Sequence, residues 1–469
     1  MSPRHQSRRD FLLNAGHGFG SLALSGLLQA ENRPTAAFPN KPPKAKRVIQ
    51  LFMNGGVSQM DTFDPKPKLA QLDGTAFDPG AGRLVESATG SPGFKVLKSP
   101  FEFRRHGHSG RWVSSVFPHI ATVVDELAFL TSMSVPTNVH GIGSYFMNTG
   151  FSLPGHPCLG AWLSYGLGRI SENLPDFVVL PDPDGLPYNN LGNFSSGFLP
   201  AQHTGTVIDT SSPSPIPFLK PPPSARHITP TSESASRDLL AHLNHDHRQR
   251  NPGDSRLDAR LRSYQLAANL QLSAPELFDL SRESTATKKL YGVGAQPTDD
   301  FARRCLLARR MAERGVRFVQ LWSGAGGPKN NWDNHANIHT ELPHMASQVD
   351  QPVAALITDL KSRGLLDDTL VIFTTEFGRM PFSQGQSGRD HNGGTFVSWL
   401  AGGGVEPGTA YGQSDPWGWK AEVPITCHDF YATVLHLLGI DHETLTVRHN
   451  GIDKRLTDVH GTVIRDILA

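Results

Sequence analysis

Three clusters of acidic and histidine side chains lie in the last third of the chain. They contain, in chain order, Asp333, His335, His339, Glu376, Asp390 and His391. Asp, Glu and His are the side chains that bind divalent metal ions in hydrolytic sites. The sequence therefore predicts a metal centre. Zinc is the favoured ion, and calcium, manganese and magnesium are the alternatives.

Each cluster also has an ordinary structural interpretation. Glu376 follows an apolar stretch, where an unpaired carboxylate is costly, and Arg379 three residues later is the simplest partner for it. The pair Asp390-His391 lies between glycines, which is also typical of a polar turn. His339 shares a face with His335 only if one helix contains both residues. A metal is favoured because all three clusters fall on one side of the same predicted sheet.

The elements around these clusters alternate between strand and helix. Apolar strands are predicted at 48–53, 127–133, 176–181, 316–322, 369–374 and 396–400, and helices at 301–314, 341–363 and 426–438. Continuous apolar strands that alternate with helices are typical of a parallel sheet covered on both faces. The predicted fold class is therefore α/β, a three-layer α/β/α sandwich with a mostly parallel sheet.

Ligands in such folds bind at the carboxyl ends of the strands. The clusters around Asp333 and Glu376 directly follow predicted strands and so belong to that edge. The same edge receives His140 and the loop after the first strand, which contains Asp61. Asp61 is a weaker candidate ligand, because the segment from Asp61 to Pro65 is also typical of a turn.

Composition limits the class of protein. The chain has 469 residues, with 44 Lys and Arg against 43 Asp and Glu, which gives a net charge of +1. Nucleic-acid binding normally requires a basic face, so no nucleic-acid partner is expected. The three cysteines, Cys158, Cys305 and Cys427, are widely spaced, which argues against both a disulfide framework and a cysteine-based zinc site.

The N-terminus has the pattern of an export signal. Ser7-Arg8-Arg9-Asp10-Phe11-Leu12-Leu13 resembles a twin-arginine motif, and a mild apolar stretch follows it. The alternative is a chance Arg-Arg pair before a first helix. We expect residues 1–45 to be a signal and linker, with no stable membrane span beyond the signal, and the protein to be periplasmic or extracellular. Residues 46–469 are expected to form one domain, with a loop-rich and helical insertion around 182–291.

Several motifs together resemble an exported family, the domain-of-unknown-function family 1501 (DUF1501). They are Asn54-Gly55-Gly56, Asp61-Thr62-Phe63-Asp64-Pro65-Lys66, Trp332-Asp333-x-His335, Glu376-Phe377-Gly378-Arg379, Asp390-His391-x-Gly393 and the ending Leu437-Leu438-Gly439-Ile440-Asp441-His442. That family is similar to the alkaline phosphatase–sulfatase superfamily. The resemblance implies an alkaline-phosphatase-like α/β/α fold and metal-assisted hydrolysis of phosphate or sulfate esters.

The chain departs from the superfamily pattern at three positions. Asn54 stands where a metal-binding Asp ends the first strand, and Glu376-Phe377 replaces an Asp-His pair. Counting back from Thr149-Gly150 to the usual nucleophile gives His140, and no Ser or Cys has the sulfatase context. The resemblance implies that the other metal position is kept, through Asp333, His335 or His339, and His391. A single metal is therefore more credible than a pair, and the alternative is a second site built by His140, Glu376 and Asp61. Water activated by that metal is the expected attacking group, with His140 as general base or nucleophile and Arg379 stabilising the anionic transition state.

The leading interpretation is an exported metal-dependent hydrolase acting on a small-molecule or glycan ester of phosphate or sulfate. The alternative is a catalytically silent exported protein that uses the same cleft to bind a glycan or a protein partner. The missing nucleophile and Asn54 favour this alternative, whereas the retained Asp, His and Glu side chains favour the enzyme. The sequence indicates neither the substrate nor the oligomeric state.

Overall fold

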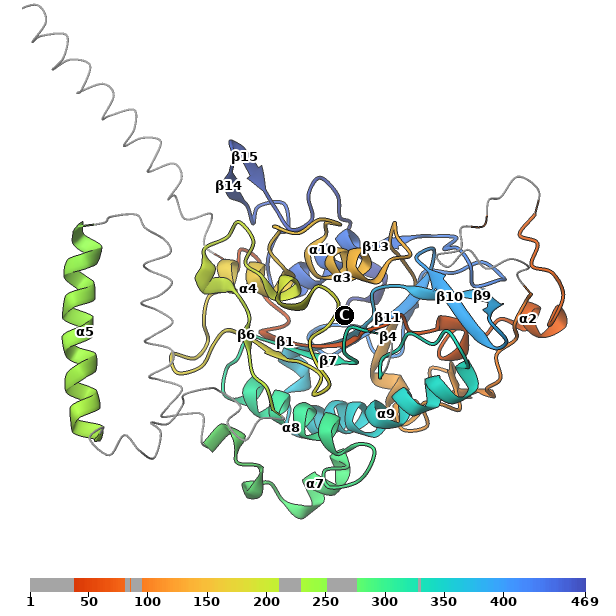
Figure 1. Ribbon diagram of the computed structural model, residues 1–469, viewed down its shortest axis with the longest axis horizontal. Helices are drawn as coiled ribbons and strands as arrows, with labels where there is room; N and C mark the ends of the chain where they lie inside the picture. Colours follow the sequence, from red (N-terminus) through yellow and green to blue (C-terminus); the bar gives the residue numbers. More distant parts are fainter. Residues whose placement is uncertain (1–37, 81–84, 86–94, 211–228, 251–275, 328–329) are drawn as a thin grey trace, which may run out of the picture.

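The computed structural model describes residues 38–80, 85, 95–210, 229–250, 276–327 and 330–469. A central sheet runs through this part of the chain, in the order β12-β4-β11-β8-β1-β7-β5-β6, with β13 paired to β4 (Figure 1). Its strands are β1 (Arg47–Met53), β4 (Leu127–Ser134), β5 (Phe177–Leu180), β6 (Thr206–Val207), β7 (Phe318–Ser323), β8 (Thr369–Thr374), β11 (Phe396–Ala401), β12 (Ala410–Tyr411) and β13 (Ile425–Thr426).

The sheet is mostly parallel, as predicted. β1 pairs in parallel with β7 and β8, and β5 pairs in parallel with β7 and β6. Only β11 runs against its two neighbours, β4 and β8. As a consequence β1, β4, β7 and β8 all point the same way, and their carboxyl ends form one edge.

Helices cover both faces of the sheet and make three layers (Figure 1). One face packs on α7 (Thr285–Tyr291), α8 (Asp299–Glu313) and α9 (Ile338–Ser362), and the other on α3 (His140–Thr149), α4 (Leu159–Leu167) and α10 (Cys427–Leu437). The alternation of side chains along a strand explains the two cores. Leu51 of β1 enters the core with α8 and α9, while its neighbour Phe52 enters the core with α3, α4 and α10.

Within the described residues, three hairpins lie outside the sheet: β2 (Phe103–His106) with β3 (Arg111–Ser114), β9 (Gly378–Gln384) with β10 (Gly388–Asn392), and β14 (Val447–His449) with β15 (Ile452–Lys454). The second hairpin corrects the interpretation of Asp390-His391 as a turn, because both residues lie in β10. Met380 and Phe382 of β9 explain why this polar segment is extended. They pack with Phe77, Trp417 and Trp419 in a small apolar cluster that anchors the hairpin.

The segment expected to be an insertion, 182–291, contains more regular structure than predicted. β6 adds an edge strand to the sheet, and α5 (Pro230–Arg250) and α7 supply the helices. Residues 211–228 and 251–275 lie outside the described part, so the boundaries of this segment stay a prediction. The three cysteines are free and buried. None of the described helices combines the length and apolar character needed to cross a membrane.

Candidate metal centre

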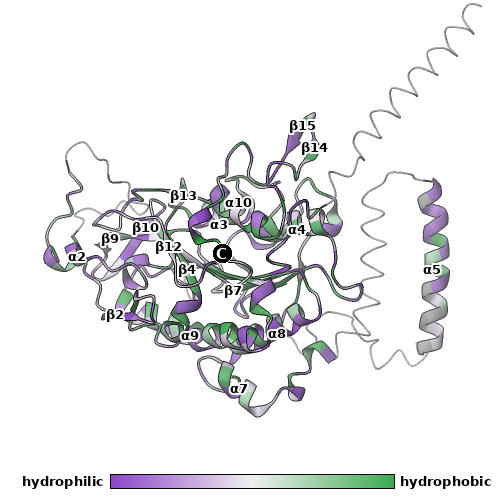
Figure 2. Cartoon of the chain, turned by 180° about the vertical axis from the view of Figure 1, so that it is seen from behind, coloured by the Kyte–Doolittle hydropathy of each residue, from purple (hydrophilic) through white to green (hydrophobic). Residues whose placement is uncertain are grey.

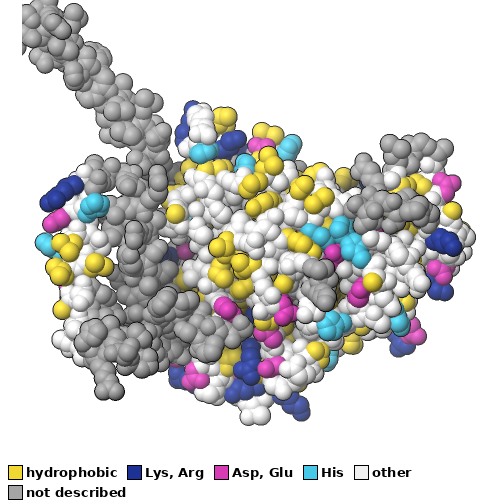
Figure 3. Space-filling view, in the orientation of Figure 1, with side chains coloured by type: hydrophobic (Ala, Val, Ile, Leu, Met, Phe, Trp, Pro, Cys, Tyr) yellow, Lys and Arg dark blue, Asp and Glu magenta, His cyan; other side chains and the backbone are white. Residues whose placement is uncertain are grey.

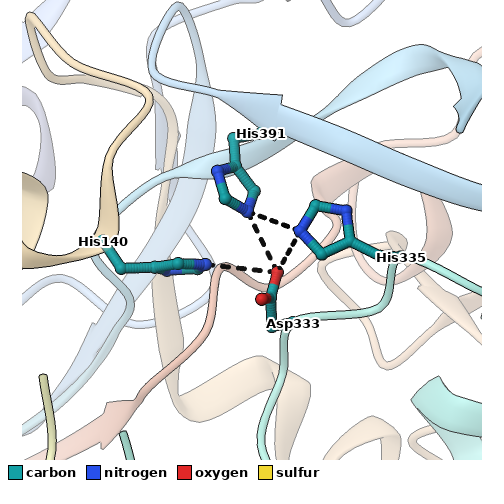
Figure 4. Close-up of side chains that lie close together, drawn as sticks. All are labelled: His140, Asp333, His335 and His391. Atoms are coloured by element: carbon teal, nitrogen blue, oxygen red, sulfur yellow. Dashed lines mark hydrogen bonds and ion pairs between the residues drawn. The ribbon is translucent and has the colours of Figure 1, made fainter. Parts of the chain in front are cut away.

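Four side chains converge at the carboxyl edge of the sheet. They are His140, Asp333, His335 and His391, and their ligand atoms all lie within 4.8 Å of one another (Figure 4). His140 is the first residue of α3, Asp333 and His335 lie in the loop between β7 and α9, and His391 lies in β10. In the space-filling view, a group of histidine side chains lies close together on the face shown (Figure 3). Three segments far apart in sequence therefore build one cluster.

The carboxylate of Asp333 is the centre of this cluster. Its Oδ1 atom lies 2.7 Å from Nε2 of His335, 3.0 Å from Nε2 of His391 and 3.2 Å from Nε2 of His140. The Nε2 atoms of His335 and His391 are themselves 2.7 Å apart. Lone pairs held this close repel one another unless a proton or a cation lies among them.

The outer nitrogen of each imidazole fixes which nitrogen faces the cluster. Every Nδ1 atom has an oxygen acceptor, so it carries the ring proton and leaves an unprotonated Nε2 facing inward. The acceptors for His140, His391 and His335 are Glu376 at 2.6 Å, the backbone carbonyl of Asn138 at 2.8 Å, and Gln384. Histidines that bind metals are oriented in this way by carboxylates and carbonyls. The donor set fits a single divalent cation.

Electrostatics favour the same arrangement. Burial alone would raise the pKa of Asp333, but the three imidazoles that contact its Oδ1 atom and the charge of Arg379 hold the pKa well below its ordinary value. Burial lowers the pKa of His391 to about 4, which leaves this ring neutral at pH 7. Burial also opposes charge on His140, but hydrogen bonds to Asp333 and Glu376 raise its pKa above the ordinary value. The cluster thus attracts one positive charge, a proton or a metal ion.

A buried polar network holds the helix that begins at His140. Gln320 of β7 donates from Nε2 to Oε1 of Gln50 at 3.1 Å and to Oδ1 of Asn148 at 2.8 Å. Asn148 lies in α3 and in turn donates to the carbonyl of Ser144 at 2.8 Å. These fully buried amides tie α3 to the centre of the sheet, so the position of His140 depends on the strands.

Glu376, predicted as a metal ligand, lies behind His140 rather than in the cluster. Its carboxylate accepts the N–H of Gly55 at 2.8 Å and the hydroxyl of Thr375 at 3.1 Å, besides the Nδ1 proton of His140. The side chain is completely buried. Glu376 is therefore positioned to orient His140, which is the role of an outer carboxylate in a metal site.

Arg379, predicted to contact the substrate, is also completely buried. Its guanidinium donates to the backbone carbonyls of Gly55, Gly56, Trp332 and Arg389, and to Oδ1 of Asp333 at 2.7 Å. These bonds occupy Nε and both terminal nitrogens within the protein. The structure therefore places Arg379 as a support for Asp333, not as a group that reaches into solvent.

Three further predicted ligands lie outside the cluster. Asp61 binds Arg389 through both oxygens, at 2.6 and 3.1 Å. The ring of His339 stacks on Phe101, with centroids 6.0 Å apart. His339 does not share a helix face with His335, because α9 begins only at Ile338. Asp390 accepts the backbone N–H of His391 at 2.8 Å.

Some residues of the site carry no signal in the sequence. The acceptor from Asn138 is a backbone carbonyl, which any residue type provides. Gln384 is a polar residue in a hairpin, and its role depends on the fold. Tyr188 stacks on the ring of His140, with centroids 4.4 Å apart and an interplanar angle of 6°, and Phe377 contacts the same ring at 4.8 Å. Only the aromatic character of Tyr188 and Phe377 could have suggested a wall of the site.

The substitution Glu376→Gln is expected to weaken metal binding by roughly 10- to 100-fold, the usual effect of removing an outer carboxylate. Glutamine keeps the shape of the side chain but removes the charge that holds the Nδ1 proton of His140. Metal affinity is measured by competition with a chromogenic chelator. His339→Ala is the matched control and should bind metal like the wild type. Equal affinity of Glu376→Gln and wild type would contradict the orienting role.

A cavity of about 440 Å³ opens beside Asp333. Its lining is polar, with three asparagine amides, the carboxylates of Asp333 and Glu341, the hydroxyl of Thr340 and the imidazole of His344. The amide oxygen of Asn334 is buried and has no hydrogen-bond partner among the described residues. The cavity thus offers polar contacts for a ligand next to the cluster.

Comparison with known proteins identifies the family. The family model described as "Protein of unknown function (DUF1501)" matches residues 45–468. No curated protein matches the chain.

Among solved structures, the lipoteichoic acid synthase LtaP from Listeria monocytogenes is 10% identical with a TM-score of 0.37, over 92% of this chain and 80% of that one. The PsFucS1 sulfatase from Pseudoalteromonas sp. is 13% identical with a TM-score of 0.35, over 92% and 75%. A phosphonate monoester hydrolase of Agrobacterium radiobacter is 13% identical with a TM-score of 0.33, over 85% and 74%. Likenesses of this size say nothing of what the present chain binds.

Proposed function

The chain belongs to the DUF1501 family, and we propose that it is an exported metal-dependent hydrolase of phosphate or sulfate esters. One observation carries the proposal: three inward-facing Nε2 atoms surround Oδ1 of Asp333, and every outer Nδ1 atom has an oxygen acceptor. The ester class is supported by the motifs that resemble the alkaline phosphatase–sulfatase superfamily. Export is supported by the twin-arginine pattern, which lies outside the described residues.

We propose zinc as the metal. Three imidazole nitrogens and one carboxylate oxygen form a donor set that suits zinc. Calcium and magnesium prefer sites made of oxygen ligands, and so fit less well. When bound, zinc would supply Lewis-acid chemistry and would lower the pKa of a water molecule that joined the four protein ligands. In this proposal His140, Asp333, His335 and His391 are the ligands.

The other residues of the site position these ligands. Glu376 holds His140, Gln384 holds His335, and Arg379 fixes Asp333 while its charge keeps the carboxylate ionised. Glu376 holds Nδ1 of His140, and the buried Nε2 atom has no hydrogen-bond partner and lies 3.2 Å from Oδ1 of Asp333. We therefore propose a ligand role for His140 in place of the general-base role expected from the sequence. No hydroxyl or thiol among the described residues bonds to the four-residue cluster. Water is therefore the attacking group that we propose.

The substrate that we propose is a small-molecule or glycan ester that enters the cavity beside Asp333. Its lining supplies amide groups from Asn330 and Asn334 and an imidazole from His344, all of which can donate hydrogen bonds to ester oxygens. The carboxylate of Glu341, which also lines the cavity, accepts the backbone N–H groups of Ala336 and Asn337 at 3.3 and 3.1 Å. Both bonds engage Oε2 of Glu341, and the amide and imidazole donors are the contacts that we propose for an anionic group.

Metal content and ester hydrolysis test the proposal together. We expect the protein purified from the exported fraction to contain about one zinc ion per chain by elemental analysis. A panel of aryl and sugar phosphates and sulfates should then reveal at least one substrate, whose hydrolysis stops on chelation and returns with zinc. A loaded protein that hydrolyses no member of a broad panel would contradict the hydrolase while leaving the metal site in place. A protein that takes up no metal would contradict both.

A further inference from the structure

A second hollow lies away from the metal cluster, where the β2–β3 hairpin meets the edge of the sheet. Its volume is about 770 Å³, and none of the four cluster residues lines it. Seen from behind, β2, β4 and β12 lie at the same end of the molecule (Figure 2). The buried rings of Phe63 and Phe129 contribute to its lining, together with Arg105, Arg111 and Trp112 of the hairpin. We call this hollow the hairpin groove.

Trp112 and Arg105 are direct cross-strand partners in the hairpin. The guanidinium carbon of Arg105 lies 5.1 Å from the centre of the Trp112 ring, and this ring remains 41% exposed. Within the described part of the chain, Arg105 has no hydrogen bond or ion pair. The hairpin groove thus presents the exposed Trp112 side chain with an arginine over one face of its ring, and no carboxylate of the described residues neutralises this arginine.

The remaining charges of the groove are mostly positive. Arg111 donates from Nε to the carbonyl of Gly408 at 3.1 Å, which is its one side-chain hydrogen bond within the described residues. Lys66 is paired with Asp64 at 2.8 Å, and these two charges cancel. The net charge of the groove is therefore positive, and it comes from the two guanidinium groups of the hairpin.

We propose that the hairpin groove binds an acidic oligosaccharide. A sugar ring has an apolar face of C–H groups that matches the exposed ring of Trp112. Guanidinium groups form paired, charge-assisted hydrogen bonds with planar or tetrahedral oxyanions, which suits the carboxylate or sulfate groups of such a chain to Arg105 and Arg111. An uncharged apolar partner would bury Arg105 without a counter-charge, at a large cost in free energy.

Calorimetric titration of the full chain tests the proposal. The probes are a heparin hexasaccharide, a hyaluronan hexasaccharide and neutral maltohexaose, so sulfate and carboxylate are separated from the sugar itself. We expect at least one acidic probe to bind and maltohexaose not to bind. Trp112→Ala and Arg105→Gln should each weaken that binding about tenfold or more.

Arg104→Gln is the matched control. Arg104 is the residue before Arg105 in β2. It faces away from the groove and pairs with Glu102 at 3.2 Å. The variant Arg104→Gln removes the same charge as Arg105→Gln and should leave oligosaccharide binding unchanged. Loss of binding in Arg104→Gln equal to that in Arg105→Gln, binding of maltohexaose as tight as that of the acidic probes, or no binding of either acidic probe would overturn the proposal. Trp112→Ala changes an exposed side chain and should unfold at the same temperature as the wild type. This measurement confirms that the variant is folded.

The groove does not depend on the proposed hydrolysis. Oligosaccharide binding should be unchanged after chelation of the metal and in Asp333→Asn. A failure of ester hydrolysis therefore leaves the groove standing, and a failure of oligosaccharide binding leaves the metal centre standing.

Discussion

Asp333→Asn is expected to abolish stable metal binding and, with it, ester hydrolysis. The Oδ1 atom of Asp333 is the one atom that all three Nε2 atoms approach, at 2.7 to 3.2 Å. Asparagine has the same shape but brings no negative charge to balance that of a bound cation. Loss of an outer partner costs roughly 10- to 100-fold in metal affinity, and loss of a direct ligand should exceed that range.

Elemental analysis after dialysis against a weak chelator measures the effect. The wild type should retain about one metal ion per chain, and Asp333→Asn close to none. Asp184→Asn makes the same change in an exposed carboxylate that binds Asn330 in the adjacent loop, and should behave like the wild type. Retention of metal by Asp333→Asn at the wild-type level would show that the carboxylate is not a ligand.

Arg389→Met is expected to lower the free energy of unfolding by about 3–5 kcal/mol, because it leaves a buried carboxylate without its partner. Arg389 and Asp61 are both completely inaccessible to solvent and form two hydrogen bonds, at 2.6 and 3.1 Å. The double variant Asp61→Asn with Arg389→Met removes both charges and should recover part of the loss. Removing one partner of a buried ion pair costs more stability than replacing both partners. The double variant is therefore expected to be more stable than Arg389→Met.

Denaturant unfolding of Arg389→Met, Asp61→Asn and the double variant measures these differences in stability. Each protein is unfolded once with excess zinc and once with chelator. The same samples separate the two roles considered for Asp61. If Asp61 is only the partner of Arg389, Asp61→Asn keeps the stabilisation by zinc. If Asp61 is a metal ligand, Asp61→Asn loses that stabilisation. A loss of stability below about 1 kcal/mol in Arg389→Met would contradict the buried pair.

The sheet was predictable because its strands are apolar runs. β1 and β8 are buried on both faces and follow the continuous pattern expected of inner parallel strands. β6 is a different case. It has only two residues within a stretch rich in Pro, Ser, Gly and Asn, and it pairs with β5 by position rather than by any pattern of its own. Short edge strands carry too little apolar surface to be recognised from sequence.

The site was predictable in its location and less so in its detail. Asp333 and His335 could be placed because the strand before them ends at the carboxyl edge of the sheet. His391 lies in the β9–β10 hairpin outside the sheet, so its strand was not predicted. The pairing of His140 with Glu376 joins residues 236 positions apart, and it depends on the rotamers of both side chains. His339 was placed with His335 by helical spacing, which fails because Asn337 caps α9 after His335. The residues that reach the centre are therefore decided by side-chain geometry, which periodicity does not contain.

X-ray diffraction from crystals of the zinc-loaded protein, recorded on both sides of the zinc absorption edge, tests the central claim most directly. We expect one strong anomalous peak among Nε2 of His140, His335 and His391 and Oδ1 of Asp333, at about 2.0–2.2 Å from each atom. Glu376, Asp61 and His339 should lie outside this coordination sphere. The absence of a peak there, or a peak bound by other residues, would contradict the metal centre described above.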